Sequence, residues 1–183
     1  EVSFSKVGIG FPSKQAAADS GKKWFPAHKG GFFRKWYGNL DYIINWENDG
    51  EALSAFPGCD NAGVAYFFKP GITWGTISSG PLAVRYSFAG CISEHCGSMC
   101  FSESNEIPYY LLALLNSSVS GIFHQFLSPT LSYRESSIGS TPCVFDDHED
   151  ATVFLSLECV TLSNSCLLRH FLSMRKLRQI SVR

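Results

Sequence analysis

A basic and aromatic segment near the start of the chain carries residue types that could bind a nucleic acid. Residues 22–35 contain five cations and no acid, with aromatic residues and Gly between them. The polar and cationic candidates in and just after this segment are Lys22, Lys23, Lys29, Arg34, Lys35 and Asn39. Lys and Arg neutralise phosphates, Asn and Arg contact base edges, and aromatic rings stack on bases or wedge between them. Alternatively, Trp24, Phe32, Phe33 and Trp36 are core residues and the cations are their solvated margin, and composition favours neither interpretation.

Potential metal ligands form no complete site. Cys91, His95, Cys96 and Cys100 supply one half of a structural zinc site, and no second half follows. The acidic run at residues 146–150 lacks the glycine-containing spacing of a calcium loop. The seven cysteines are an odd number in a chain long enough to fold without disulfides, so we expect reduced thiols and no metal.

Catalytic motifs are also missing. The sequence contains no GxxxxGK[ST], GxGxxG between a strand and a helix, GxSxG or HExxH motif. Ser78, Ser79 and His124 could enter a Ser–His–Asp arrangement, but nothing in the sequence places His124 beside the serines. We therefore expect no active site of the chain's own.

The composition is that of a globular protein. The chain has 183 residues, of which 45% are hydrophobic and 17% charged, with a net charge of −1. This length fits one domain, or one domain with an appendage. No apolar run is long enough for a membrane span and no signal peptide is present, so the sequence predicts a cytoplasmic protein without membrane contact. Because the first residue is Glu, a fragment of a larger protein is also considered.

Hydrophobic patterning predicts an α/β (α+β) fold, in which a twisted mixed or antiparallel sheet is followed by helices. Short runs rich in β-branched and aromatic residues predict strands at residues 32–37, 42–46, 64–68, 72–77, 82–87 and 98–101. Helical spacing of apolar residues predicts helices at about residues 107–127, 148–161 and 165–178, the last of them basic.

Several runs, taken in order, resemble the C-terminal half of the adenine-specific DNA methyltransferases of BREX phage-defence systems, the PglX type. The runs are KKWFP (22–26), GGFFRKWYGN (30–39), INWENDG (44–50), ITWGTISSG (72–80), VRYS (84–87), GSMCF (97–101), YLLALLNS (110–117) and LSPTL (127–131). The order of strands, a leucine-rich helix and a Pro-Thr-Leu segment is also similar to the target recognition domains of restriction-modification specificity subunits.

The resemblance implies that this chain is a part of such a methyltransferase that recognises DNA but does not carry out methyl transfer. The S-adenosylmethionine motif and the Asn-Pro-Pro-Tyr motif of that family do not occur in this sequence. No cofactor is therefore expected in this chain, and S-adenosylmethionine is implied for the full-length protein. Residues 1–145 would form a target recognition domain, and residues 146–183 a helical extension that is atypical after about residue 163. The implied partners are double-stranded DNA, other BREX subunits and a methyltransferase domain.

Two segments that flank the sheet and the long helix in this resemblance offer hydroxyls beside an Arg and an aromatic residue. Their candidate base-reading residues are Thr73, Ser78, Ser79, Arg85 and Tyr86 in the first, and Ser128, Thr130, Tyr133 and Arg134 in the second. The alternative is that Arg85 and Tyr86 only finish a strand, with Arg85 paired to an acid such as Glu94. A protein-interaction module that docks a partner subunit or phage protein is the second hypothesis for the whole chain, and a self-contained enzyme is the third.

Overall fold

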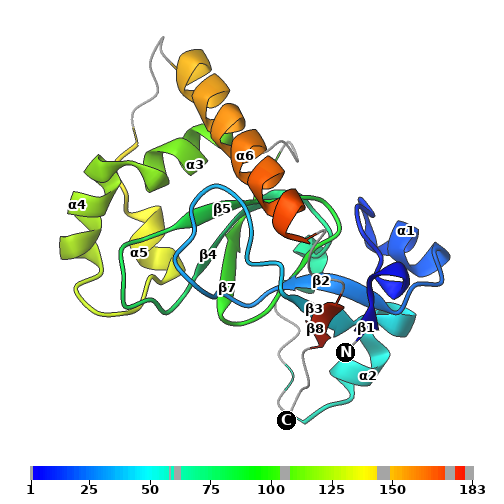
Figure 1. The fold of residues 1–183 in the computed structure, drawn as a ribbon. Coiled ribbons are helices and arrows are strands. Elements are labelled where there is room, and N and C mark those ends of the chain that lie inside the picture. Colours follow the sequence, from blue (N-terminus) through cyan, green and yellow to red (C-terminus); the bar gives the residue numbers. More distant parts are fainter. Residues whose placement is uncertain are drawn as a thin grey trace.

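The computed structural model describes residues 2–57, 59, 63–103, 108–143, 149–171 and 176–179 (Figure 1). Its strands are β1 (Val2–Ser3), β2 (Trp24–His28), β3 (Tyr42–Asn45), β4 (Gly71–Gly75), β5 (Val84–Ser87), β6 (Ile92–Ser93), β7 (Gly97–Cys100) and β8 (Lys176–Gln179). Its α-helices are α1 (Lys14–Asp19), α2 (Glu51–Ser54), α3 (Tyr109–Asn116), α4 (Ser118–Leu127), α5 (Glu135–Gly139) and α6 (Glu149–Phe171). Short 3₁₀ helices are η1 (Phe4–Lys6), η2 (Glu47–Gly50) and η3 (Val64–Tyr66). The predicted α/β (α+β) class is confirmed.

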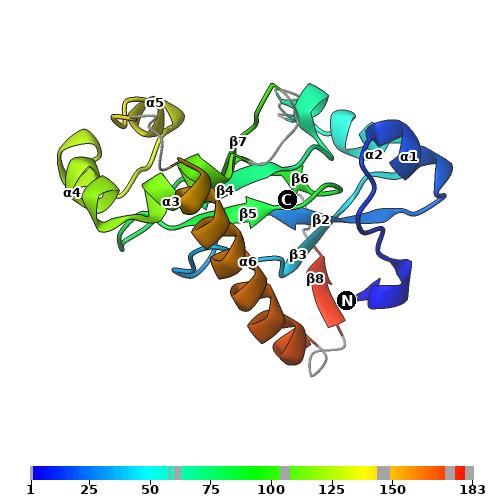
Figure 2. The ribbon, with the colours of Figure 1, turned by 90° about the horizontal axis from the view of Figure 1, so that it is seen from above.

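Two sheets occupy the middle of the described structure. Their strand orders are β1-β8-β3-β2-β6 and β5-β4-β7. In the first sheet β2 is antiparallel to β3 and parallel to β6, whereas both pairs of the second sheet are antiparallel. The prediction of mixed or antiparallel sheet is thus confirmed. Figures 1 and 2 show α3, α4 and α5 at one end of the molecule and α1 and α2 at the other.

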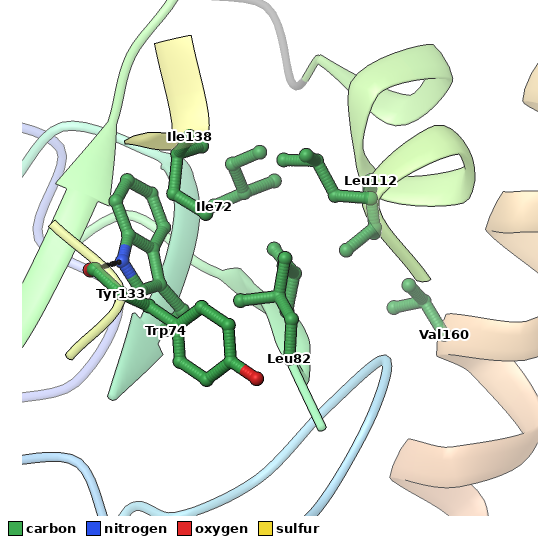
Figure 3. Close-up of a cluster of buried hydrophobic side chains, with 9 residues drawn as sticks. Ile72, Trp74, Leu82, Leu112, Tyr133, Ile138 and Val160 are labelled. Atoms are coloured by element: carbon green, nitrogen blue, oxygen red, sulfur yellow. Dashed lines mark hydrogen bonds between the residues drawn. The ribbon is translucent and has the colours of Figure 1, made fainter. Parts of the chain in front are cut away.

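The three-stranded sheet buries one face against helices. Ile72 and Trp74 are two residues apart on β4 and therefore point to the same side of the sheet. There they form a hydrophobic cluster with Leu112 of α3, Ile138 of α5 and Val160 of α6 (Figure 3). The Trp74 indole also donates a hydrogen bond of 2.9 Å to the carbonyl oxygen of Tyr133. This bond joins the sheet to the segment that follows α4.

The five-stranded sheet has a separate core. Phe25 of β2 packs edge to face on Phe68, with ring centroids 5.2 Å apart, and Trp46 packs on Phe68 in the same cluster. The two sheets approach closely where Gly97 lies against the His28 carbonyl group. Glycine is required there because a β-carbon would clash with that carbonyl group. A hydrogen bond of 2.8 Å between His28 Nε2 and Ser87 Oγ also joins β2 to β5.

The strand predictions are confirmed for β3, β4, β5 and β7 but fail at two places. Residues 64–66 form the 3₁₀ helix η3, and residues 32–37 form a loop that pairs with β5 only at Trp36. Sequence patterning also missed β2, which contains Pro26. Proline is tolerated there because Pro26 and Ile43 are a non-hydrogen-bonded pair of the β2–β3 ladder, and β6 pairs with β2 only at Ala27 and His28, so the missing N–H breaks no ladder bond to either strand.

The helix predictions locate α3, α4 and α6 but are wrong about where these helices divide and where the last one ends. The helix predicted over residues 107–127 divides at Ser117, which has extended backbone angles and caps α4 by accepting a hydrogen bond from Ser120 N. The two helices predicted beyond residue 148 are the single helix α6 as far as Phe171. Residues 176–179 then form β8 instead of helix. None of the helices described is both long and apolar enough to cross a membrane.

Candidate nucleic-acid interface

The two segments predicted to read bases meet in space. Ile77, after β4, forms an antiparallel bridge with Ser132, which follows α4. Ser78 N donates to the Leu131 carbonyl oxygen at 2.9 Å, and Tyr133 N donates to that of Thr76 at 2.7 Å. Backbone bonds therefore hold the two loops in a fixed register.

A pocket of about 440 Å³ opens between these two loops and α4. Five predicted site residues line it, namely Ser78, Ser79, Ser128, Thr130 and Tyr133. The described residues that line it include no Lys, Arg, Asp or Glu. Its polar groups are therefore neutral hydrogen-bonding groups, which suit an uncharged partner better than a phosphate.

His124 and Ser128 add buried polar groups to this pocket. Burial lowers the pKa of His124, so its imidazole is neutral near pH 7. Its Nε2 lies 3.0 Å from Thr141 Oγ1, whereas its Nδ1 and the Ser128 hydroxyl have no hydrogen-bond partner among the described residues. Both atoms are therefore buried polar groups whose hydrogen-bonding capacity the described residues leave unused.

Sequence reasoning did not select His124 as a DNA contact, although a signal was available. Ser120 and His124 lie four residues apart on α4, and Ser128, which directly follows the helix, continues this spacing, so that the three fall on one side. All three are buried. The structure brings His124 to the same pocket as Ser78 and Ser79, but no acid among the described residues lines that pocket, so no Ser–His–Asp triad forms there.

Other predicted members of the first segment lie inside the protein. Thr73 is fully buried and donates to the Ser98 carbonyl oxygen at 2.9 Å. Arg85 is 2% exposed, and its Nη1 donates to the carbonyl oxygens of Arg34 and Ala83. Burial, and then the charge of Arg34, lowers the pKa of Arg85 to about 10. A DNA contact by Thr73 or Arg85 would therefore require the protein to open.

Arg85 and Tyr86 do lie within β5, but the suggested partner of Arg85 is engaged elsewhere. Glu94 accepts a hydrogen bond from Cys96 N, and no ion pair to Arg85 forms among the described residues. The half-buried Tyr86 ring stacks on Tyr109, with ring centroids 6.2 Å apart. Arg134 and Thr130, in the second segment, are exposed.

The cations of residues 22–35 are divided by β2. Lys22 Nζ donates to the Ser5 carbonyl oxygen at 2.9 Å, and Lys23 Nζ pairs with Glu47 at 2.8 Å. Lys29 Nζ lies 5.6 Å from the centre of the Tyr42 ring, and Lys35 Nζ donates to the Asn116 carbonyl oxygen at the end of α3. In the described part of the chain, Lys29, Arg34 and Lys35 have no ion pair.

The aromatic residues of this segment also fall into two groups. Trp24 and Trp36 are half-buried and pack against the cores, as the structural alternative predicted. Phe32 and Phe33, in contrast, are 89% and 56% exposed. Asn39 is buried, and its side-chain amide donates to the Phe32 carbonyl oxygen at 2.9 Å.

The cysteines and acids offer no metal centre within the described residues, where no group of three or more His, Cys, Asp or Glu side chains converges. Cys91 is buried, and burial raises the pKa of its thiol to about 12. Residues 146–148 of the acidic run lie outside the described part of the chain.

Comparison with known proteins gives two related sequences. No model of a protein family matches the chain. The chain is 38% identical over 149 residues to the adenine-specific methyltransferase PglX of Lacticaseibacillus casei (strain Zhang), and 32% identical over 142 residues to the adenine-specific methyltransferase BrxX of Escherichia coli O9:H4 (strain HS). These matches cover 78% and 76% of this chain but 12% of each relative. The chain is therefore related to a short part of BREX-type adenine-specific methyltransferases.

Proposed function

We propose that this chain is a DNA-recognition part of a BREX-type adenine-specific methyltransferase and positions a duplex for methylation by another part of the protein. The observation that carries the proposal is the bridge between Ile77 and Ser132, because it joins the two segments that the sequence assigns to base reading. The similarity to two adenine-specific methyltransferases supports DNA as the partner. Such a protein would act in the cytoplasm, in phage defence.

The base-reading surface is the rim of the pocket together with Arg134. Ser79 and Thr130 expose hydroxyl groups, and Arg134 exposes a guanidinium group at the start of α5. Hydroxyl groups bond either donors or acceptors on bases, and Arg is the commonest reader of guanine. These three residues are accessible without any change in the fold.

The phosphate contacts are assigned to Lys29, Arg34 and Lys35. These cations have no ion pair among the described residues, whereas Lys23 is partly neutralised by Glu47. Phosphate contacts supply affinity that depends strongly on salt and weakly on sequence. The cations therefore complement the pocket rim, where affinity depends on the base.

Methyl transfer is assigned to a methyltransferase domain outside this chain. The chain lacks the S-adenosylmethionine and Asn-Pro-Pro-Tyr motifs of the family it resembles. We therefore assign it no cofactor-binding residue. Calorimetry of the chain with S-adenosylmethionine checks this assignment, and micromolar binding would contradict it.

Selection from a randomised duplex pool, followed by binding of the recovered duplex across a salt series, tests the DNA-recognition proposal. We expect an enriched sequence and affinity that falls as salt rises. Arg134→Ala should lose about 1–3 kcal/mol on the recovered duplex and much less on a single-base variant at the contacted position. Equal losses on both duplexes would make Arg134 a phosphate contact, and no enrichment would reject sequence recognition by this chain.

A protein-interaction module is the second candidate, and exposed apolar side chains on α4 and α6 favour it. Phe126 is 78% exposed, and Leu162 is 70% exposed. Single exposed apolar residues are ordinary, but α4 and α6 each expose several, and such a group is typical of a contact surface. Co-purification with a methyltransferase domain, lost in a Phe126→Ser and Leu162→Ser double variant that still binds DNA, would support this role.

A further inference from the structure

The loop that presents Phe32 is braced from within. Gly31 has a φ of 121°, and a β-carbon there would lie 3.1 Å from the Asn39 amide nitrogen. That amide donates to the Phe32 carbonyl oxygen at 2.9 Å, and Asn39 itself has a φ of 57°. The backbone at Phe32 is thus tied to a buried side chain seven residues later.

Contacts with the sheets and helices hold the loop on both sides of its tip. On one side, Gly30 packs against the Cys96 carbonyl oxygen, where a β-carbon would approach to 3.0 Å. On the other, Trp36 N donates to the Val84 carbonyl oxygen at 2.9 Å, and Lys35 Nζ donates to that of Asn116 at 2.6 Å. Figure 1 shows this loop, in lighter blue between β2 and β3, passing in front of β4 and β5.

The exposure of Phe32 is therefore that of a ring held out on a supported loop. An apolar ring that is 89% exposed gains nothing from the chain's own core. A rigid support lowers the ordering cost of inserting that ring into a partner. An exposed ring on a supported loop, as Phe32 is, is suited to contact with a partner molecule.

The charges around Phe32 indicate the chemistry of the partner. Lys29, Arg34 and Lys35 lie within three residues of it along the chain and have no ion pair among the described residues. Apolar rings among cations, with Phe32 the most exposed and Phe33 56% exposed beside it in the chain, match a polyanion that has apolar slots between its charges. Stacked bases between two phosphate backbones have this arrangement.

We propose that Phe32 is a wedge that enters a base step of the bound duplex, partly unstacks it and bends the duplex. Proteins that insert an apolar wedge in this way flank it with cations that contact the adjacent phosphates. This inference rests on the proposed function, because it takes duplex DNA as the partner. It adds a residue that deforms the duplex to the residues that contact phosphates and bases.

The test uses the duplex recovered by the selection experiment, with 2-aminopurine replacing each adenine in turn and a donor and acceptor dye at its ends. Binding of the full chain should raise 2-aminopurine fluorescence at one step and shorten the distance between the dyes. Phe32→Ala should abolish both signals and weaken binding roughly tenfold or more. Phe32→Leu should keep part of each signal, because it retains an apolar wedge.

Phe126→Ala is the matched control, because Phe126 is also a strongly exposed Phe and lies on α4. It should leave both optical signals unchanged, and all three variants should keep the thermal midpoint of the parent chain. Salt-dependent binding without unstacking or bending at any position would overturn the wedge and leave the DNA-recognition proposal intact. Absence of duplex binding at any salt concentration would overturn both proposals.

Discussion

The loop of residues 29–41 and the two loops around the pocket adjoin the same three-stranded sheet, but they differ in charge. The first loop carries Lys29, Arg34 and Lys35 without an ion pair among the described residues. The described lining of the pocket has no charged side chain, and backbone hydrogen bonds join its loops. Cations bind the phosphates of any sequence, whereas fixed neutral donors and acceptors distinguish bases. In the proposed complex with DNA, the first loop would therefore supply affinity and the pocket loops would supply specificity.

The largest expected effect comes from removing the side chain that fixes the pocket loops to the sheet. Trp74 is almost fully buried, and its indole donates to the Tyr133 carbonyl oxygen. Trp74→Ala should lower the free energy of unfolding by about 3–5 kcal/mol, because it leaves a cavity and an unpaired carbonyl group. Urea denaturation measures this loss. Trp74→Phe keeps most of the apolar contact, so a loss as large as that of Trp74→Ala would assign the effect to the hydrogen bond.

A smaller loss of stability is expected in acid, at the junction between the two regions. His28 ends β2 immediately before the cationic loop and bonds Ser87 of β5. Burial, and then the charge of Arg85, lowers the pKa of His28 from 6.5 to about 3. His28 therefore takes up a proton at a higher pH in the unfolded chain than in the folded chain. The stability of the folded chain that depends on a neutral His28 is complete above pH 6.5 and is lost as the pH falls towards 3.

The expected loss attributed to His28 is about 2–3 kcal/mol between pH 6.5 and about pH 4.5. Urea denaturation at a series of pH values measures it. His28→Gln, which cannot be protonated, should show a shallower dependence on pH over this interval. An unchanged dependence in this variant would assign the acid sensitivity to other groups, such as His124, whose pKa is also lowered by burial.

Next in size is the effect of removing the cations. Combined replacement of Lys29, Arg34 and Lys35 by Ala should weaken binding on all duplexes alike, by roughly tenfold at low salt, and reduce the salt slope by up to about one unit per lost phosphate contact. Lys23→Ala is the control, because Lys23 already pairs with Glu47. If Lys23→Ala reduced the slope more than the triple replacement did, the phosphate surface would lie at the start of β2.

The division of the basic segment shows why charge along a sequence does not give charge in space. The acid-free stretch of residues 22–35 predicted one cationic face. Antiparallel pairing of β2 with β3 places Trp24 opposite Asn45, and this brings Lys23 to Glu47 from the neighbouring acidic stretch. The contact between Lys23 and Glu47 depends on the pairing of β2 with β3. It was not predicted because β2 itself was not predicted.

Short sequence patterns predicted the strands and helices whose formation depends on neighbouring residues in the chain. Runs rich in β-branched and aromatic residues located β4 and β5, and helical spacing of apolar residues located α3 and α4. The break at Ser117 was missed because a serine continues a helix or caps one according to its backbone angles. The meeting of the two predicted reading segments was beyond local reasoning, but His124 could have been chosen from its spacing with Ser120 and Ser128.

The smallest expected effect separates recognition from structure at the pocket itself. The Ser128 hydroxyl is buried and has no hydrogen-bond partner among the described residues, so it adds little to the stability of the free chain. Ser128→Ala should therefore change the free energy of unfolding by less than about 0.5 kcal/mol, because it removes a polar atom whose burial is not compensated. If the pocket receives a polar group of the bound DNA, the same variant should lose about 1 kcal/mol of binding on the preferred duplex. Thermal melts and binding isotherms on matched samples measure both quantities. A large loss of stability with unchanged binding would make Ser128 a structural residue and remove the pocket from the reading surface, leaving Arg134 and the exposed hydroxyl groups of Ser79 and Thr130 to account for specificity.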